Sequence, residues 1–334
     1  MTIRLPTCIY NAEQTREIDA ALVASGIPGG ELMQRAADAL WEQLQRRWPG
    51  HGELTVLCGG GNNAGDGYLL ARLAHMAGWY VQVFAISSPP RLGGDAAHAC
   101  RAAEAAGVRV NSWASDASLR GLVVDALLGT GVAEQVREPY AGAIRAINAS
   151  GLPVISVDLP SGLHADTGRT LGEAVHADLT VTFITLKVGL LTGLGPDHVG
   201  ELHFAPLADL PPNTPDPIAC RLNLDQWSGS LGKRPRGAHK GMFGHVLVIG
   251  GDLGMGGAVL LAAETALRSG AGRVSAATRS AHIAPLLTRC PEVMVHAAED
   301  PQAIEALLAL ASVLIVGPGL GKGDLGRNVM DQVL

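Results

Sequence analysis

Short apolar runs alternate with longer segments of helical periodicity through most of the chain. The spacing of apolar residues in the longer segments predicts helices at 11–25, 31–48, 94–106 and 138–150, with another beginning near Tyr68. The runs themselves are typical of strands buried on both faces, and they fall at 54–58, 80–86, 108–113, 121–127, 153–159 and 178–184. Because strands that alternate with helices form right-handed crossovers, this part is predicted to be an α/β domain with a doubly wound, mostly parallel sheet.

A proline-rich stretch interrupts this pattern between residues 206 and 217. Its composition suits a semi-rigid spacer, so we divide the chain into a first domain (1–210), a linker (211–222) and a second α/β domain (223–334). The second domain is predicted to contain strands at 245–251, 273–278 and 312–321 and helices at 258–269, 280–288 and 301–310. A parallel sheet needs both faces covered, and the last helical pattern runs to the final residue without a cap. We therefore expect this domain to be truncated.

Composition narrows the class of protein. The 334 residues carry a net charge of −6 with scattered lysine and arginine, which argues against nucleic acid as a partner. The five cysteines form no C-x-x-C pair, so neither a disulfide framework nor a zinc site is indicated. No apolar segment has the length of a membrane span and the N-terminus lacks the apolar region of a signal peptide, so the expected location is cytoplasmic, with no membrane partner.

Polar, glycine-bearing loops follow three of the predicted strands, at 59–66, 125–131 and 158–162. The carboxyl ends of parallel strands meet at one edge of a sheet, so these loops are expected to converge on a ligand. In the first loop, the glycines between 59 and 67 are expected to take positive φ and to bring the backbone close to that ligand. Amides at the start of the following helix favour an anionic group such as a phosphate.

The side chains on these loops leave two kinds of chemistry open. Asp125 and Asp158 each end an apolar strand, where a single aspartate could serve only as a turn cap, but two carboxylates facing one loop are a candidate pair for proton transfer. Alternatively, an aspartate with Asn63 and the hydroxyl of Ser161 is an all-oxygen set that suits a hard cation. Lys187 follows strand 178–184 and either meets a phosphate or carboxylate or is solvated.

A pattern in the first loop also permits an ordinary dinucleotide site. Gly59, Gly61 and Ala64 satisfy G-x-G-x-x-A between a strand and a helix. The next strand ends without the acid that would bind a ribose, although Arg91 could face an NADP 2′-phosphate. An NADP-dependent oxidoreductase is therefore one alternative function, and a module that binds pyridine nucleotides without turnover is another.

Several segments resemble a known family. GGGNNAGDG (59–67), VVDALLGTG (123–131), VDLPSGL (157–163) and TFITLKVGLLTG (182–193) resemble the Rossmann-like NAD(P)H-hydrate epimerase domain. HKGMFGHVLVIGGDLGMGGA (239–258), ALRSGAGRVSAATR (266–279) and IVGPGLG (315–321) are similar to the start of the fused, ribokinase-like ADP-dependent NAD(P)H-hydrate dehydratase. The resemblance implies repair of hydrated NADH and NADPH: one domain interconverts the R and S forms at C6, and the other dehydrates the S form using ADP.

The resemblance also implies roles for individual residues. Asn63, Asp125 and Ser161 are the implied ligands of a potassium ion. Asp158 is our own expected catalytic acid and base, because it ends a strand and faces the glycine-rich loop. Expected substrate contacts in the first domain are Asn62, Asn63, Ala64, Gly65, Asp66, Gly129, Thr130, Gly131, Val132, Ala133, Glu134, Gln135 and Asp158. Ala258 and Gly319 are the expected contacts in the second domain.

The remaining expectations concern cofactors, assembly and departures from the family. ADP and Mg²⁺ are implied for the dehydratase half, and the helices that precede the sheet suggest a homodimer or higher homo-oligomer. Ala64 stands where the family usually has glycine, so substrate affinity is expected to shift if this position requires positive φ. The nucleotide loop and catalytic aspartate of the dehydratase do not occur in 223–334, so we expect epimerase activity without dehydratase activity.

Overall fold

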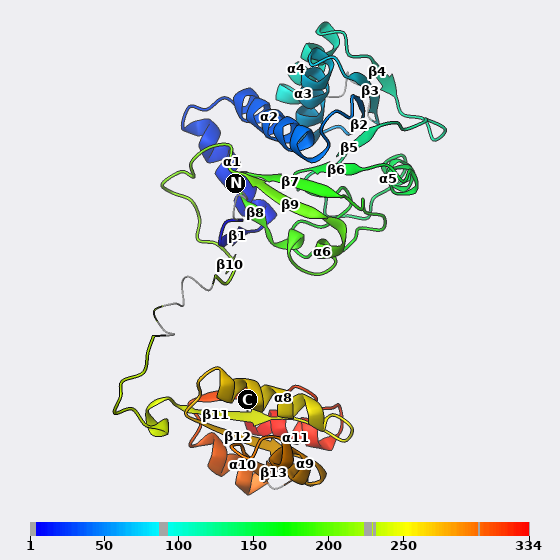
Figure 1. The fold of residues 1–334 in the computed structure, drawn as a ribbon. Helices are drawn as coiled ribbons and strands as arrows, with labels where there is room; N and C mark the ends of the chain where they lie inside the picture. Colours follow the sequence, from blue (N-terminus) through cyan, green and yellow to red (C-terminus); the bar gives the residue numbers. More distant parts are fainter. Residues whose placement is uncertain (1–4, 87–92, 224–228, 230–231, 300, 334) are drawn as a thin grey trace. The chain divides into compact units, whose positions relative to one another are not determined.

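The computed structural model describes residues 5–86, 93–223, 229, 232–299 and 301–333. The chain forms two compact units, residues 1–227 and 228–334 (Figure 1). Residues 211–222, which the sequence assigns to a linker, include strand β10 (Ala219–Cys220), which pairs antiparallel with β1 (Cys8–Tyr10). The first unit therefore continues past residue 210 and ties its two ends together.

The first unit is built on a seven-stranded sheet in the order β4-β3-β2-β5-β6-β7-β9. Each neighbouring pair is parallel, so the predicted fold class is confirmed. The strand order reverses between β2 and β5, and ligands of doubly wound sheets bind at such a reversal. The strands are β2 (Glu53–Cys58), β3 (Tyr80–Ala85), β4 (Val110–Ser112), β5 (Leu122–Ala126), β6 (Val154–Val157), β7 (Leu179–Phe183) and β9 (Glu201–Ala205). A smaller sheet has the order β10-β1-β8, with β8 at Leu186–Lys187.

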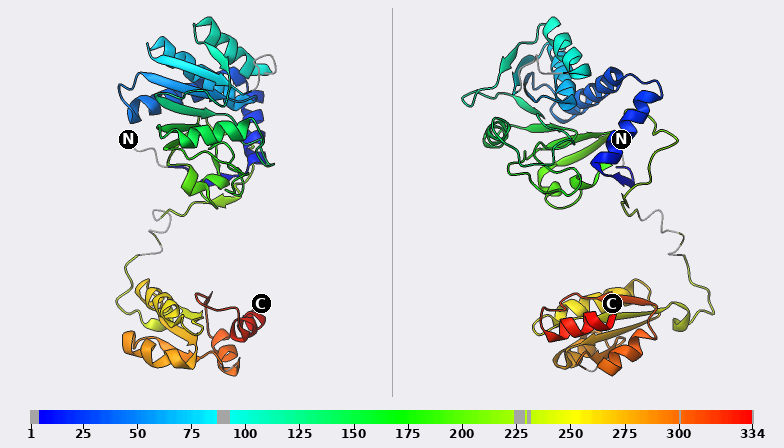
Figure 2. Two further views of the ribbon diagram at one scale, coloured as in Figure 1. Left: turned by 90° about the vertical axis from the view of Figure 1, so that its right-hand side faces the viewer. Right: turned by 180° about the vertical axis from the view of Figure 1, so that it is seen from behind.

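Helices cover both faces of the large sheet. On one face lie α1 (Ala12–Ala24), α2 (Gly29–Arg47), α3 (Asn62–Met76) and α4 (Gly94–Ala105) (Figure 2). The apolar sides of these helices share one core with β2. On the other face, α5 (Tyr140–Ala149) packs Ile144 and Ile147 in a separate core with Leu57 and Val123. A short 3₁₀ segment (Val188–Leu190) and α6 (Gly195–His198) follow β8.

The glycine-rich loop differs from its prediction. Helix α3 begins at Asn62, inside the predicted turn, and none of the glycines between 59 and 67 has positive φ. They permit close packing instead: a Cβ on Gly59 would lie 1.8 Å from the carbonyl oxygen of Leu127, and one on Gly67 would lie 2.5 Å from Cβ of Ala126. Ala64 is fully buried inside α3 and has no positive φ, so the backbone conflict expected for its methyl group does not arise.

The second unit contains a four-stranded parallel sheet in the order β13-β12-β11-β14. Its order reverses between β11 and β14. The strands are β11 (His245–Ile249), β12 (Arg273–Thr278), β13 (Met294–Ala297) and β14 (Val313–Val316), and the helices are α8 (Gly256–Arg268), α9 (Ile283–Arg289), α10 (Pro301–Leu308) and α11 (Asp324–Val333). Two 3₁₀ segments lie at Lys240–Met242 and Ser280–His282. In the described part of the chain, no helix is long and apolar enough to cross a membrane.

Candidate functional site

A cavity of about 770 Å³ opens where the strand order of the large sheet reverses. The loops after β2, β5 and β6 meet there, as the sequence predicts for the carboxyl ends of parallel strands. Of the expected site residues, the cavity is lined by Asn62, Asn63, Asp66, Gly129, Thr130, Gly131, Val132 and Asp158. These residues bring amide, hydroxyl and carboxylate groups and two short runs of backbone amides to one space.

Other expected contacts lie elsewhere. Ala64 and Gly65 are buried within α3, where a Cβ on Gly65 would lie 2.4 Å from Sδ of Met33. Ala133, Glu134 and Gln135 are not among the residues that line the cavity, and the Glu134 side chain is 85% exposed. Arg91, on which the NADP alternative depends, lies outside the described residues.

The first two helices supply lining residues that the sequence analysis missed. Thr15, Arg16 and Asp19 come from α1, and Leu32 and Met33 come from α2. The polar residues fall within one turn of α1, beside its apolar stripe, and this clustering was the available signal. Amphipathicity shows which face of a helix is buried but not what that face contacts. The hydrophobic pattern could therefore predict only that these helices pack on the sheet or on a partner subunit.

Asp158 lies directly after β6 and is held by groups from the neighbouring strand. Its backbone N–H donates to the carbonyl of Val181 (2.8 Å). Its Oδ1 accepts hydrogen bonds from Thr182 Oγ1 (3.1 Å) and from the Phe183 N–H (3.1 Å), and it forms an ion pair with Nζ of Lys187. Lys187 is thus buried against a carboxylate, one of the alternatives left open by the sequence, and it is not solvated.

Backbone strain is concentrated around this cavity. Three non-glycine residues in the described ranges have positive φ: Asp158 (67°), Ile184 (61°) and Leu207 (58°). All three line the cavity. Such conformations are costly for residues with a Cβ and are characteristic of functional sites, where the surrounding structure holds them in place.

The carboxylates in the cavity influence one another. Burial, together with the negative charges of Asp158 and Asp19, raises the pKa of Asp66 well above its ordinary value. Burial and the charge of Asp158 also raise the pKa of Asp19. Asp66 is therefore easier to protonate than an exposed aspartate, whereas Asp158 is paired with an ammonium group. Neighbouring carboxyl groups in such different surroundings can give and take a proton within one site.

The expected potassium ligands meet behind this cavity. Asp125 is fully buried, and its carboxylate accepts hydrogen bonds from Ser161 Oγ (2.5 Å), the Ser161 N–H (2.8 Å) and Ser156 Oγ (2.9 Å). The third expected ligand, Asn63, is connected to Ser161 through the carbonyl oxygen of Leu128, which lies 3.3 Å from both Asn63 Nδ2 and Ser161 Oγ.

The oxygen atoms of this set are of the kind that bind a cation. Burial raises the pKa of Asp125 while hydrogen bonds from Ser161 oppose the rise, and Asp125 forms no ion pair with any residue that the structure describes. A buried carboxylate without a counter-charge, beside hydroxyl, amide and carbonyl oxygens, suits a hard monovalent cation. No cluster of three or more histidine, cysteine, aspartate or glutamate side chains that could hold a metal occurs among the described residues.

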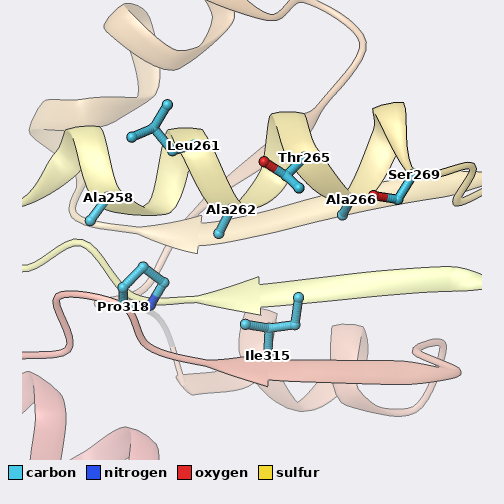
Figure 3. Close-up of a pocket in the computed structure, with 8 residues that line it drawn as sticks. All are labelled: Ala258, Leu261, Ala262, Thr265, Ala266, Ser269, Ile315 and Pro318. Atoms are coloured by element: carbon cyan, nitrogen blue, oxygen red, sulfur yellow. The ribbon is translucent and has the colours of Figure 1, made fainter. Parts of the chain in front are cut away.

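The second unit places its two expected contacts side by side. Gly319 has a φ of 69°, and a Cβ on it would lie 3.6 Å from Cβ of Ala258. Both residues flank the reversal of strand order in the second sheet. A hollow of about 600 Å³ runs along α8, where Ala258, Ala262 and Ala266 project toward the strands (Figure 3). No charged side chain lines this hollow, so the first cavity offers the richer chemistry.

A doubly wound parallel sheet with a polar cavity at its switch point defines an α/β protein of the nucleotide-binding class. The family described as YjeF-related protein N-terminus matches residues 29–189, and the family described as NAD(P)H-hydrate dehydratase matches residues 246–334. The bifunctional NAD(P)H-hydrate repair enzyme Nnr of Coxiella burnetii is 44% identical over 98% of this chain and 68% of its own length. The chain therefore belongs to the family of bifunctional NAD(P)H-hydrate repair enzymes, and the resemblance inferred from the motifs is confirmed.

Two further comparisons set the extent of the match. The Escherichia coli enzyme of the same name is 40% identical over 99% of this chain and 65% of its own length, so the chain spans about two thirds of these relatives. The crystal structure of yeast YNL200c shares 23% identity, covers 54% of this chain and 82% of that chain, and has a TM-score of 0.49. Because the dehydratase family matches residues 246–334, the comparisons do not support the expected absence of dehydratase activity.

Proposed function

We propose that the first unit epimerises hydrated NADH and NADPH at C6, with Asp158 as the acid and base. The observation that carries this proposal is the place of Asp158: its carboxylate lines the cavity at the switch point, on a strained backbone, beside the loops expected to bind the dinucleotide. Family membership supports the substrate class. The alternatives, an NADP-dependent oxidoreductase and a non-catalytic binding module, have no comparable observation in their favour.

Epimerisation requires proton transfer and no change in oxidation state. A carboxylic acid protonates the C6 hydroxyl, the C–O bond breaks, and water departs. The ring nitrogen stabilises the cation that remains. Water then adds to the opposite face of C6 and gives its proton to a carboxylate, which restores the starting protonation of the site. A positioned carboxyl group typically accelerates such steps by about 10²–10⁴-fold.

The substrate phosphates are proposed to bind at the start of α3 and along residues 129–132. Free amides at the N-terminus of a helix favour anions, and α3 begins at Asn62 in the wall of the cavity. The cavity is otherwise rich in carboxylates, so the dinucleotide needs compensating positive charge. A potassium ion held by Asn63, Asp125 and Ser161 would supply it.

The test of this function starts from one purified hydrate epimer. We expect the protein to convert the pure R or S form into a mixture of both, which chromatography detects. We also expect ¹⁸O from labelled water to be incorporated at C6 during the conversion. A pure epimer that stays pure would contradict the proposal and favour a binding module. A change in nicotinamide absorbance with an added carbonyl compound would favour the oxidoreductase.

Removal of potassium should slow epimerisation. In a buffer where choline replaces potassium we expect a loss of about tenfold, equivalent to about 1.4 kcal/mol, that added potassium reverses. Asn63→Ala should weaken the response because it removes one oxygen ligand while leaving the buried Asp125–Ser161 pair in place. Initial rates measured against potassium concentration decide this; a rate independent of potassium in the wild-type protein would contradict the site.

The second unit is proposed to belong to the dehydratase half, with Ala258 and Gly319 as substrate contacts and ADP and Mg²⁺ as cofactors. Formation of NADPH from the S hydrate, with and without ADP and Mg²⁺, reports dehydration separately from exchange of the epimers. Cytoplasmic location and a homodimeric or higher assembly stay predictions of the sequence.

A further inference from the structure

Lys187 is the most deeply buried charged group in the wall of the cavity, with only 1% of its side chain exposed. Its backbone is fixed because β8 pairs in parallel with β1, with Lys187 opposite Tyr10. Its ammonium donates to Asp158 Oδ1, to Thr182 Oγ1 (3.1 Å) and to the carbonyl of Phe183 (2.9 Å). An ammonium group has three protons, so all of its donor capacity is used inside the protein and none is left for a substrate phosphate.

These bonds join the two strained turns that follow β6 and β7. At the first turn, the Leu159 N–H donates back to the Val157 carbonyl (2.8 Å) across Asp158. At the second, the Thr185 N–H donates back to the Phe183 carbonyl (2.6 Å) across Ile184. Lys187 bonds the side chain of the first turn and the backbone of the second, so it fixes the position of the carboxylate relative to β7.

The hydrogen bonds to the Asp158 carboxylate are unevenly divided. Lys187, Thr182 and the Phe183 N–H all donate to Oδ1. Oδ2 has no partner within the described residues, and 15% of the side chain is exposed in the cavity wall. We propose that Lys187 is a positioning residue, which holds Asp158 by Oδ1 so that Oδ2 is the oxygen that exchanges a proton with the hydroxyl group on C6. This inference rests on the proposed epimerase function.

A buried lysine in an active site can either bind the substrate or orient a reacting group. A residue that binds substrate equally in the ground and transition states changes KM, whereas one that orients a reacting group changes kcat. A carboxylate displaced by about 1 Å can cost about 10²-fold in rate. Lys187→Met removes the ammonium and keeps a side chain of similar length, so it tests the three bonds that the ammonium makes.

We expect Lys187→Met to lower kcat for epimerisation by about 10²-fold while KM stays within about threefold. Thr182→Val, which removes one of the other bonds to Oδ1, should lower kcat by about fivefold. Thr180→Val is the matched control: Thr180 is equally buried, lies two residues earlier on β7, and donates to the carbonyl of Val199 (2.8 Å), away from Asp158. Its kcat should match that of the wild-type protein.

The outcomes are distinguishable. Thermal melting first establishes that each variant is folded; if Lys187→Met is not, the comparison of Thr182→Val with Thr180→Val decides the question alone. The inference is overturned if folded Lys187→Met keeps its kcat, if KM rises while kcat is unchanged, or if the two threonine variants behave alike. A wild-type protein that does not exchange the epimers would overturn the proposed function itself.

Discussion

Replacement of Asp158 by asparagine should nearly abolish epimerisation, with kcat reduced by about 10²–10⁴-fold. Asparagine has the shape of aspartate, and its amide oxygen can still accept from Thr182, Lys187 and the Phe183 N–H. It cannot protonate the hydroxyl group on C6 or take the proton of the incoming water. The rate of exchange between the R and S hydrates, measured by chromatography at saturating substrate, gives the result.

Asp178→Asn provides the control for this substitution. Asp178 lies directly before β7, at the opposite end of that strand from Thr182 and Phe183, and its Oδ2 accepts from the Val154 N–H (2.8 Å). Asparagine can accept the same bond, so the variant should epimerise at close to the wild-type rate. Near-normal turnover by Asp158→Asn would remove Asp158 from the chemistry.

Gly59→Ala should destabilise the first unit by about 3 kcal/mol. The new Cβ would lie 1.8 Å from the carbonyl oxygen of Leu127 and 2.8 Å from its carbonyl carbon. Both are backbone atoms at the end of β5, so relief requires the two central strands to separate where the Gly59 N–H donates to the Ala126 carbonyl (3.0 Å). The same movement would distort the cavity, so activity should fall as well.

Gly61→Ala is the matched control in the same loop. No atom lies within 4 Å of a Cβ at this position, and its φ of −112° suits any residue. We expect a cost of about 1 kcal/mol or less, because alanine is a poorer N-cap than glycine. None of the chain's five tryptophans lies in residues 228–334, so fluorescence during urea denaturation carries no tryptophan signal from the second unit, and Trp41, Trp48, Trp79 and Trp113 report the first. Equal free energies of unfolding for the two variants would contradict the packing argument.

The sequence predicts the parallel order and the edge where the site forms, because both follow from local pattern. Asp125 and Asp158 could both be placed at this edge from the sequence, since each ends an apolar strand, but of the two only Asp158 is among the residues that line the cavity, and Asp125 is fully buried. Strand β8 was missed because its two residues are too few to show a period. Strand β9 was missed because it lies at the edge of the sheet, is only partly buried and lacks a continuous apolar run.

Contacts between distant segments could not be predicted in this way. The lysine at 187 has the same local sequence whether it meets water or Asp158, and only the tertiary fold decides between them. The glycines of the first loop illustrate the same limit. Their residue type was informative, but the reason for it was misjudged: Gly59 and Gly67 avoid collisions with Leu127 and Ala126, and neither takes a positive φ.

The peptide group of Leu128 lies between the proposed ion site and the proposed phosphate loop, so binding at one is expected to affect binding at the other. Its N–H donates to Ser161 Oγ (2.9 Å), its carbonyl lies against Asn63, and Gly129 follows it into the proposed phosphate loop. A bound ion would order the peptide of Leu128, and a bound dinucleotide would order the adjacent peptide of Gly129. Whichever ligand binds first would therefore reduce the conformational entropy that the second ligand has to remove. Linkage is reciprocal, so any factor by which the proposed potassium ion tightens binding of the dinucleotide must equal the factor by which the dinucleotide tightens binding of that ion. Titrating each ligand in the presence and absence of the other would measure one coupling free energy twice.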